Sequence, residues 1–303
     1  MFLTNSSIEF AINHILKYYD SDFFIKPFEF EAIKMFKNEV IKYLTSKEVD
    51  HFSVEPPKTF AVHKPKGGYR VVHQLDPLDS IIYTALTRDI AEKIETARCN
   101  ISDSAVCSYR INIKNSNFFE DGNGYEDFNS KSDNLAKKYK FVLITDIVDF
   151  YNQIYLHRLR NSIEFVDASL EEISGVIENF LMKLNNKNSK GIPVGPSASI
   201  IMAEALLLDI DQFLVNKGFE YVRYVDDFRV FADNKIDLEW LLHDITDYIY
   251  ENHRLTLSSS KTEIIDTTTF HKEYLFDADA IEKQRIHTEL EKVQSVLSTP
   301  GCF

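Results

Sequence analysis

Tyr224-Val225-Asp226-Asp227 stands between two short apolar runs, Phe-Glu-Tyr-Val-Arg at 219–223 and Phe-Arg-Val-Phe-Ala at 228–232. Tyr, Val and Phe favour strands and Asp favours turns, so the stretch predicts a tight turn between two strands. Two adjacent carboxylates repel each other, and a bound cation would remove that repulsion. Most Asp-Asp pairs are solvated turn residues, so this pair needs a further metal ligand elsewhere in the chain to indicate a site.

A second acidic position supplies that ligand. Asp146 ends the compact apolar run 141–146, which predicts a buried strand. If this strand lies beside the hairpin in one sheet, Asp146 and Asp226 come together. Two divalent cations held by such carboxylates lower the pKa of a hydroxyl and stabilise the leaving oxygen of an in-line phosphoryl displacement. Magnesium suits these oxygen ligands.

The composition is that of a folded protein. The chain has 303 residues, of which 44% are apolar and 27% charged, enough for a real core. No apolar run is long enough to span a bilayer, and the N-terminus lacks a signal-peptide pattern, so no membrane partner is expected. Cys99, Cys107 and Cys302 are odd in number and lack metal-ligand spacing, which predicts a reduced, cytoplasmic protein.

The formal net charge of −13 has the wrong sign for a general nucleic-acid binder, because phosphate contacts come from Lys and Arg. A local basic channel remains compatible with an acidic chain. The segment 58–70, which contains Lys64 and Arg70, forms one basic cluster. The lysines at 137–140 are interpreted as ordinary solvated residues.

The order of predicted elements indicates an α+β fold. Before residue 141 the chain predicts a helix over 30–44, strands over 59–63 and 69–72 joined by a Gly-rich turn, a helix from 76 to 90 and a long surface loop over 113–135. From there it predicts a strand over 141–146, helices over 170–184 and 197–215, the hairpin, a helix over 238–250 and a strand over 262–265. A mixed sheet with helices packed on one face, the ferredoxin-like plan, satisfies this order.

Taken in order over roughly residues 55–265, these features resemble the reverse transcriptases. Asp146 resembles the metal-binding aspartate of motif A, and residues 224–227 resemble motif C, the metal-binding hairpin. Lys261 resembles the motif D lysine, which protonates the leaving pyrophosphate. The resemblance implies a nucleotidyltransferase of the RNA-directed DNA polymerase class. Its implied catalytic residues are Asp146, Asp226, Asp227 and Lys261, and its implied ligands for two Mg²⁺ ions, with Mn²⁺ as a substitute, are Asp146, Ile147, Asp226 and Asp227.

Other motifs resemble the nucleotide-binding part of that family. Residues 64–70 resemble the fingers hairpin, whose basic side chains meet the incoming triphosphate, and the loop 191–195 with the helix after it resembles motif B. Tyr151, five residues after Asp146, resembles the aromatic residue that rejects a 2′-hydroxyl, which implies dNTP substrates. The implied nucleotide-binding residues are Lys64, Arg70, Tyr151, Pro193 and Gly195.

The resemblance also implies a right-hand polymerase core with fingers, a ferredoxin-like palm and a minimal or truncated helical thumb. The implied domains are 1–140 for the fingers and N-terminal helical region with part of the palm, 141–265 for the palm with motifs A to D, and 266–303 for a short C-terminal helical segment at the start of a thumb. The helix predicted over 282–297 is too small for a thumb bundle. A homo-oligomer or a partner protein is therefore expected to supply that surface.

Finer features resemble one bacterial branch, the abortive-infection and defence-associated reverse transcriptases. They are Asp-Ile-Val-Asp-Phe-Tyr-Asn-Gln-Ile-Tyr-Leu-His at 146–157, Gly-Ile-Pro-Val-Gly-Pro-Ser at 191–197 and Arg-Tyr-Val-Asp-Asp-Phe at 223–228. Members of that group protect bacteria against phage, and some make DNA without a template on a protein hydroxyl. The implied partners are dNTPs, an RNA template or a structured non-coding RNA, and the DNA product.

Two alternatives stay open from the sequence. Val194 stands where many retroviral-type enzymes carry Gln, and Val cannot make that hydrogen bond near the nucleotide. This favours a template-independent polymerase, which a protein hydroxyl could prime. The second alternative is a non-catalytic RNA-binding or assembly subunit that retains the polymerase residues.

Overall fold

A four-stranded antiparallel sheet forms the centre of the computed structural model, which describes residues 1–19, 24–64, 67–102, 104–122 and 124–275. Its strands are β5 (Phe141–Asp146), β6 (Glu220–Tyr224), β7 (Asp227–Ala232) and β8 (Glu263–Asp266). Their spatial order is β6-β7-β5-β8, so the two central strands, β7 and β5, lie side by side although they are distant in sequence. This is the strand order of the ferredoxin-like plan, so the ferredoxin-like topology predicted from the sequence is confirmed.

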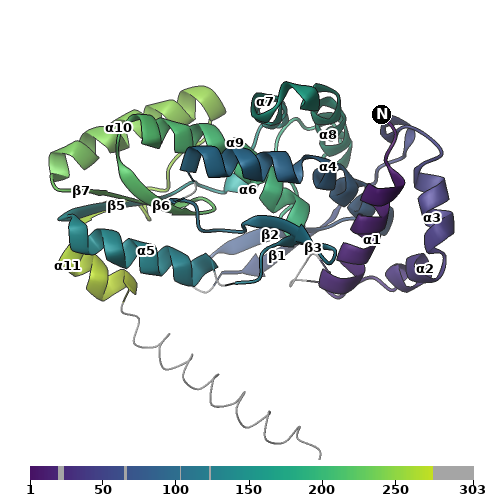
Figure 1. Cartoon of the computed structure of the whole chain (residues 1–303), viewed down its shortest axis with the longest axis horizontal. Helices are drawn as coiled ribbons and strands as arrows, with labels where there is room; N and C mark the ends of the chain where they lie inside the picture. The colour runs from purple at the N-terminus through teal and green to yellow at the C-terminus, as the bar shows by residue number, and fades with distance from the viewer. Residues whose placement is uncertain (20–23, 65–66, 103, 123, 276–303) are drawn as a thin grey trace, which may run out of the picture.

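Helices cover both faces of this sheet, as Figure 1 shows. The helices α9 (Ser197–Asn216) and α10 (Lys235–His253) lie on one face, and α5 (Gly124–Lys138) and α11 (Thr267–Phe270) lie on the other. Side chains alternate accordingly: Leu143 of β5 joins the core cluster under α9 and α10, whereas its neighbour Val142 packs with Phe128 and Phe270. The predictions of a mixed sheet and of helices packed on one face were therefore wrong, because all pairings in this sheet are antiparallel and helices lie on both faces.

The prediction of a surface loop over 113–135 was also wrong. The segment contains the strands β3 (Ile111–Lys114) and β4 (Asn117–Phe119) and most of α5. Along α5 the polar Ser132 occupies an inward position between Phe128 and Leu135, so the apolar spacing of a helix is interrupted in the sequence. Arg229 of β7 donates a hydrogen bond to the Ser132 hydroxyl at 2.9 Å, which lets this polar side chain be buried.

The N-terminal half contains a helical layer and a separate hairpin. Its helices are α1 (Asn5–Tyr18), α2 (Glu29–Met35), α3 (Lys37–Leu44) and α4 (Pro77–Ser102), and its hairpin pairs β1 (Lys58–His63) with β2 (Tyr69–Gln74). The helix predicted over 30–44 is divided at Phe36, whose φ of −111° and ψ of 36° are not helical. α4 packs against both α1 and α9, which joins the helical layer to the sheet.

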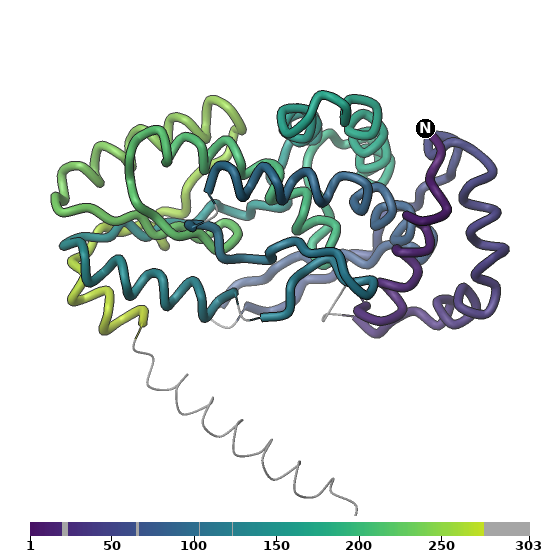
Figure 2. Tube along the Cα trace, in the orientation of Figure 1, coloured from purple at the N-terminus to yellow at the C-terminus, as the bar shows by residue number. Residues whose placement is uncertain are grey.

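The molecule is elongated. The N-terminal helices α1 to α3 lie at one end, and α10 and α11 lie at the other (Figure 2). Between them lie α6 (Phe150–Gln153), α7 (Leu156–Val166) and α8 (Glu171–Leu184), of which only α8 was predicted. None of the described helices has the length and apolar character that a membrane span requires. The predicted C-terminal helix over 282–297 lies outside the described residues.

The packing of α5 predicts the effect of Phe128→Ala. The Phe128 ring is 2% exposed and lies against the Arg229 guanidinium, with 3.9 Å between Arg229 Cζ and the ring centroid. Its removal should lower the free energy of unfolding by about 3–5 kcal/mol, because a buried ring leaves a cavity. Phe165→Ala is the matched control, since that ring is 70% exposed on α7. Urea unfolding measures both, and equal effects would contradict the packing of α5.

Candidate active site

A pocket of about 350 Å³ lies where the end of β5, the β6–β7 turn and the β1–β2 hairpin meet. The predicted site residues that line it are Lys64, Arg70, Asp146, Ile147, Tyr151, Gly195, Asp226, Asp227 and Lys261. Pro193 is the predicted nucleotide-binding residue that does not line it; this proline is buried. The pocket therefore collects residues from segments almost 200 positions apart in the sequence.

Strand pairing brings the two acidic positions together. β5 pairs antiparallel with β7, and Asp146 lies opposite Asp227 at the end of the ladder. Just beyond the ladder, the Ile147 N–H donates to the carbonyl oxygen of Asp226 at 3.4 Å. On the other side, the Ser258 N–H donates to the carbonyl oxygen of Asp146 at 2.8 Å. The main chain that carries Asp146 is thus held from both sides.

The carboxylates of the pocket crowd one another. Burial, together with the negative charges of Asp146 and Asp227, raises the pKa of Asp226 to about 7. Burial and the Asp146 charge also raise the pKa of Asp227. These upward pKa shifts show that the protein by itself does not neutralise the cluster of Asp146, Asp226 and Asp227.

Lys261 supplies the one positive charge that contacts Asp146 directly within the described residues. Its ammonium donates a hydrogen bond to the Asp146 carboxylate. Burial lowers the pKa of Lys261, but this hydrogen bond and the nearby acidic charges outweigh burial, so the net shift is upward. The lysine is therefore protonated at neutral pH while it touches the acidic group.

The donor set suits a hard divalent cation. The lining side chains Asp146, Asp226 and Asp227 offer carboxylate oxygens, and Ile147 can offer a main-chain oxygen because its side chain packs in the core. Within the described residues no three His, Cys, Asp or Glu side chains already form a metal cluster. The raised pKa of Asp226 nonetheless indicates a local excess of negative charge that a cation would relieve.

The remaining wall of the pocket is formed around Tyr151. Its main-chain carbonyl accepts a hydrogen bond from the Ile192 N–H at 2.9 Å, which ties α6 to the glycine loop. Gly195 in that loop has a φ of +132°, a conformation that favours glycine. Asp149 has a local partner, because its carboxylate accepts a hydrogen bond from Asn152 Nδ2 at 2.7 Å.

Val194 belongs to this loop, contacts the β1–β2 hairpin through His73 and has no polar side chain. Its N–H donates to His73 Nδ1 at 3.0 Å, and its carbonyl oxygen accepts from the His73 N–H at 2.9 Å. Both main-chain groups of Val194 are thus used within the protein. The Val194 side chain can contribute shape to the pocket, but it has no group for a hydrogen bond to a ligand.

A protein-family model described as "Reverse transcriptase (RNA-dependent DNA polymerase)" matches residues 62–275, more than two thirds of the chain. The chain belongs to the reverse transcriptase family. The match includes the β1–β2 hairpin from Val62 onward, both acidic positions and Lys261. No curated protein matches the chain by sequence.

Solved structures similar to this reverse transcriptase-family chain include two structures of telomerase from Candida tropicalis. The apo telomerase has a TM-score of 0.51 at 15% identity, and the similarity covers 78% of this chain and 49% of the telomerase chain. The telomerase in complex with a fragment of telomeric RNA has a TM-score of 0.52 at 16% identity, with 78% and 45% covered. At this identity the likeness shows the fold, the right-hand polymerase core, and this chain spans about half the length of those telomerases.

The pocket of this reverse transcriptase also contains residues that the sequence did not single out. Tyr109, Asn152 and Tyr224 line it together with the predicted set. Tyr109 follows α4 in a left-handed conformation, with a φ of +45°, and belongs to none of the motifs. Tyr224 was a usable signal, because it lies two residues before Asp226 in the stretch that predicts the hairpin. Tyr109 reaches the pocket only through tertiary packing, and no local pattern predicts it.

The raised pKa of Asp226 predicts how the stability of the metal-free protein changes with pH. An unfolded aspartate ionises near 3.8 and folded Asp226 near 7, so the folded state holds the extra proton between these values. The free energy of unfolding should therefore fall as pH rises from about 4 to 7. Asp226→Asn should reduce this loss, with the remainder due to other buried carboxyls of raised pKa such as Asp227, and it should be more stable than the wild type at pH 8, by roughly 1–3 kcal/mol.

The measurement is thermal unfolding across pH 4–8 in a chelator. A constant difference between Asp226→Asn and the wild type over that range would contradict the assignment of the proton to Asp226. Mg²⁺ or Mn²⁺ should restore the stability of the wild type at pH 8 and have less effect at pH 6, because protons then compete for the same carboxylate.

Proposed function

We propose that this reverse transcriptase is a DNA polymerase that adds deoxynucleotides to a 3′ or protein hydroxyl. The observation that supports the proposal most is the meeting of Asp146, at the end of β5, and Asp226, in the β6–β7 turn, in a pocket that also contains Arg70 and Lys64. Carboxylates for cations and basic groups for phosphates are the two requirements of nucleotidyl transfer. The substrates are dNTPs, and the template is RNA or a structured RNA that the protein binds.

Asp146 and Asp226, with Asp227 and the Ile147 main chain, would hold two divalent ions, for which we propose Mg²⁺ with Mn²⁺ as a substitute. When bound, such ions activate the attacking hydroxyl and stabilise the leaving oxygen. Asp146 and Asp226 orient that centre, because strand pairing fixes their main chain. Lys261 is protonated beside it and can donate its ammonium proton to the leaving pyrophosphate.

The other residues of the pocket act on the nucleotide. The Arg70 guanidinium offers a fork of N–H donors that matches phosphate oxygens, and Lys64 adds a second positive charge for the triphosphate. Tyr151 would place its ring under the sugar and exclude a 2′-hydroxyl, which makes deoxynucleotides the preferred substrates. Gly195 lets the main chain approach the nucleotide closely.

We further propose that residues 1–140 hold the fingers and part of the palm, that 141–265 complete the palm and that 266–303 begin a thumb. A second copy of the chain or a partner protein would then complete the surface that grips nucleic acid. The cytoplasm is the proposed compartment, because the cysteines are odd in number and lack metal-ligand spacing.

A primer-extension assay tests the polymerase activity. The wild type should extend a DNA primer with dNTPs and Mg²⁺, and Asp226→Ala should lower kcat on the order of 10³-fold, since metal-ion stabilisation amounts to several kcal/mol. Asp244→Asn is the control, because its ion pair with Lys217 lies outside the pocket. Equal activity of Asp226→Ala and Asp244→Asn would remove Asp226 from the reaction.

Template-independent synthesis is the second candidate, and Val194 favours it. Because its side chain is apolar, Val194 cannot make the side-chain hydrogen bond that a Gln at this position would make near the nucleotide. The same assay with each dNTP alone and no template separates the candidates. Incorporation without template supports the second candidate, and strict dependence on template rejects it.

We propose antiphage defence, as in the abortive-infection branch, for the biological role; the motif resemblance alone supports it. Cells that express the chain should survive phage challenge, and replacing Asp226 and Asp227 by Ala should abolish that protection. Plaque counts on the two strains, at matched protein levels, measure the effect. Protection that survives the double replacement would favour the non-catalytic RNA-binding role instead.

A further inference from the structure

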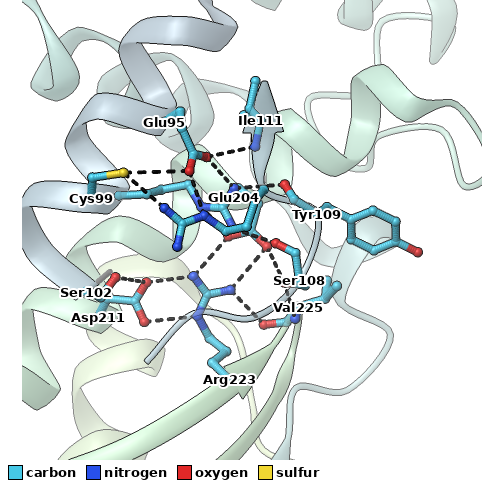
Figure 3. Close-up of polar contacts among 12 residues, drawn as sticks. Glu95, Cys99, Ser102, Ser108, Tyr109, Ile111, Glu204, Asp211, Arg223 and Val225 are labelled. Carbon is cyan, nitrogen blue, oxygen red and sulfur yellow. Dashed lines mark hydrogen bonds and ion pairs between the residues drawn. The ribbon is translucent and has the colours of Figure 1, made fainter. Parts of the chain in front are cut away.

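A buried polar network lies between α4, α9 and β6 and reaches the turn that carries Asp226 (Figure 3). Arg223 of β6 is fully buried at its centre. Its guanidinium donates to both carboxylate oxygens of Asp211 and of Glu204 at 2.6–3.3 Å, and to the carbonyl oxygen of Val225 at 3.0 Å. All five N–H donors of the guanidinium thus have an acceptor.

The charges within this network balance. Arg98 of α4 and Arg223 face Glu204 and Asp211 of α9, and each of the four side chains is at most 1% exposed. Burial raises the pKa of Glu204, but the charges of Arg223 and Arg98 outweigh it, so the net pKa lies below its ordinary value. Glu204 therefore stays ionised and holds its hydrogen-bond donors firmly.

Ser108 connects the network to the turn. The Val225 N–H donates to Ser108 Oγ at 3.0 Å, and the same hydroxyl donates to Glu204 Oε1 at 3.0 Å. Ser108 is itself fixed, because its carbonyl oxygen accepts from Arg98 Nη2 at 2.6 Å. Both main-chain groups of Val225, the N–H and the carbonyl, are consequently bound to the network, the first through Ser108 and the second through Arg223.

Val225 needs this support. Its φ of +54° is left-handed, a conformation that is strongly disfavoured for a β-branched residue. A strained residue of this kind persists only where its surroundings determine its conformation. Val225 immediately precedes Asp226, so relaxation of its φ would redirect the Asp226 carboxylate away from Asp146.

We propose that Ser108 and Arg223 are positioning residues for the site: through the main chain of Val225 they hold Asp226 where it shares a cation with Asp146. Neither residue lines the pocket, so neither touches the reacting groups. The kinetic consequence rests on the polymerase activity proposed above. The consequence for cation binding does not depend on that activity.

Ser108→Ala tests the proposal and Ser102→Ala is its matched control. Ser102 is also buried and also donates to a network carboxylate, Asp211 Oδ2 at 3.3 Å, but it does not contact the turn. Ser108→Ala should lower kcat by about 10- to 100-fold with little change in the KM for dNTP, because a small misplacement of a catalytic group costs that much. It should also weaken the rise in Tm caused by Mn²⁺. Ser102→Ala should leave kcat and the Mn²⁺-induced rise in Tm within about twofold of the wild-type values.

A double-mutant cycle with Val225→Gly adds a readout that a merely structural role would not move. Glycine adopts a positive φ without strain, so the turn should depend less on Ser108 in that background. Ser108→Ala should then lower the Mn²⁺-induced rise in Tm less than it does beside Val225. A full-sized effect of Ser108→Ala in the Gly background would overturn the proposal.

Equal Mn²⁺ responses of Ser108→Ala and Ser102→Ala would also overturn the proposal, whatever their thermal stabilities. If the wild type adds no nucleotide under any condition, the proposed polymerase function fails. The Mn²⁺ measurements then decide the positioning role alone, with the same expected and contradicting results.

Discussion

The register between β5 and β7 places Asp146 opposite Asp227 and next to the Asp226 turn. Side chains of a strand alternate between the two faces, so a slip of one residue would turn Leu143 away from the core and move both acidic positions. Both faces of the sheet are covered by helices, and the apolar alternation on each face opposes such a slip. The geometry of the pocket therefore depends on how well both layers pack.

The protein treats buried charge in two opposite ways within one region. Around Arg223 the charges are paired and hydrogen bonded, and the carboxylate of Glu204 stays ionised. In the pocket next to it, the acidic groups are left with too little positive charge, and the pKa of Asp226 rises to about 7. Balanced charges give a rigid support, whereas unbalanced charges give affinity for a cation. Val225 joins the two regions.

Much of the fold was predictable because its strands and long helices have strong periodic patterns. Phe141–Asp146 was predicted with its observed bounds, and the helix that begins at Ser197 was predicted within one residue at its end. α5 was missed because a polar residue, Ser132, takes an inward position there and is satisfied by a distant arginine. Such a compensation cannot be read from local spacing, since the partner lies about 100 residues away in the chain.

The sequence by itself determined the type of chemistry: two acidic positions, a basic hairpin, a glycine loop and a lysine occur in the order of one family, and local propensities place each on its element. Only the tertiary structure decided that Lys261 contacts Asp146, that Tyr109 enters the pocket and that His73 uses both main-chain groups of Val194. It also decided that Ser108 and Arg223 hold the turn. The physical reason is that side-chain type and spacing are local properties, whereas the shift of a pKa and the support of a strained residue depend on groups brought together by folding.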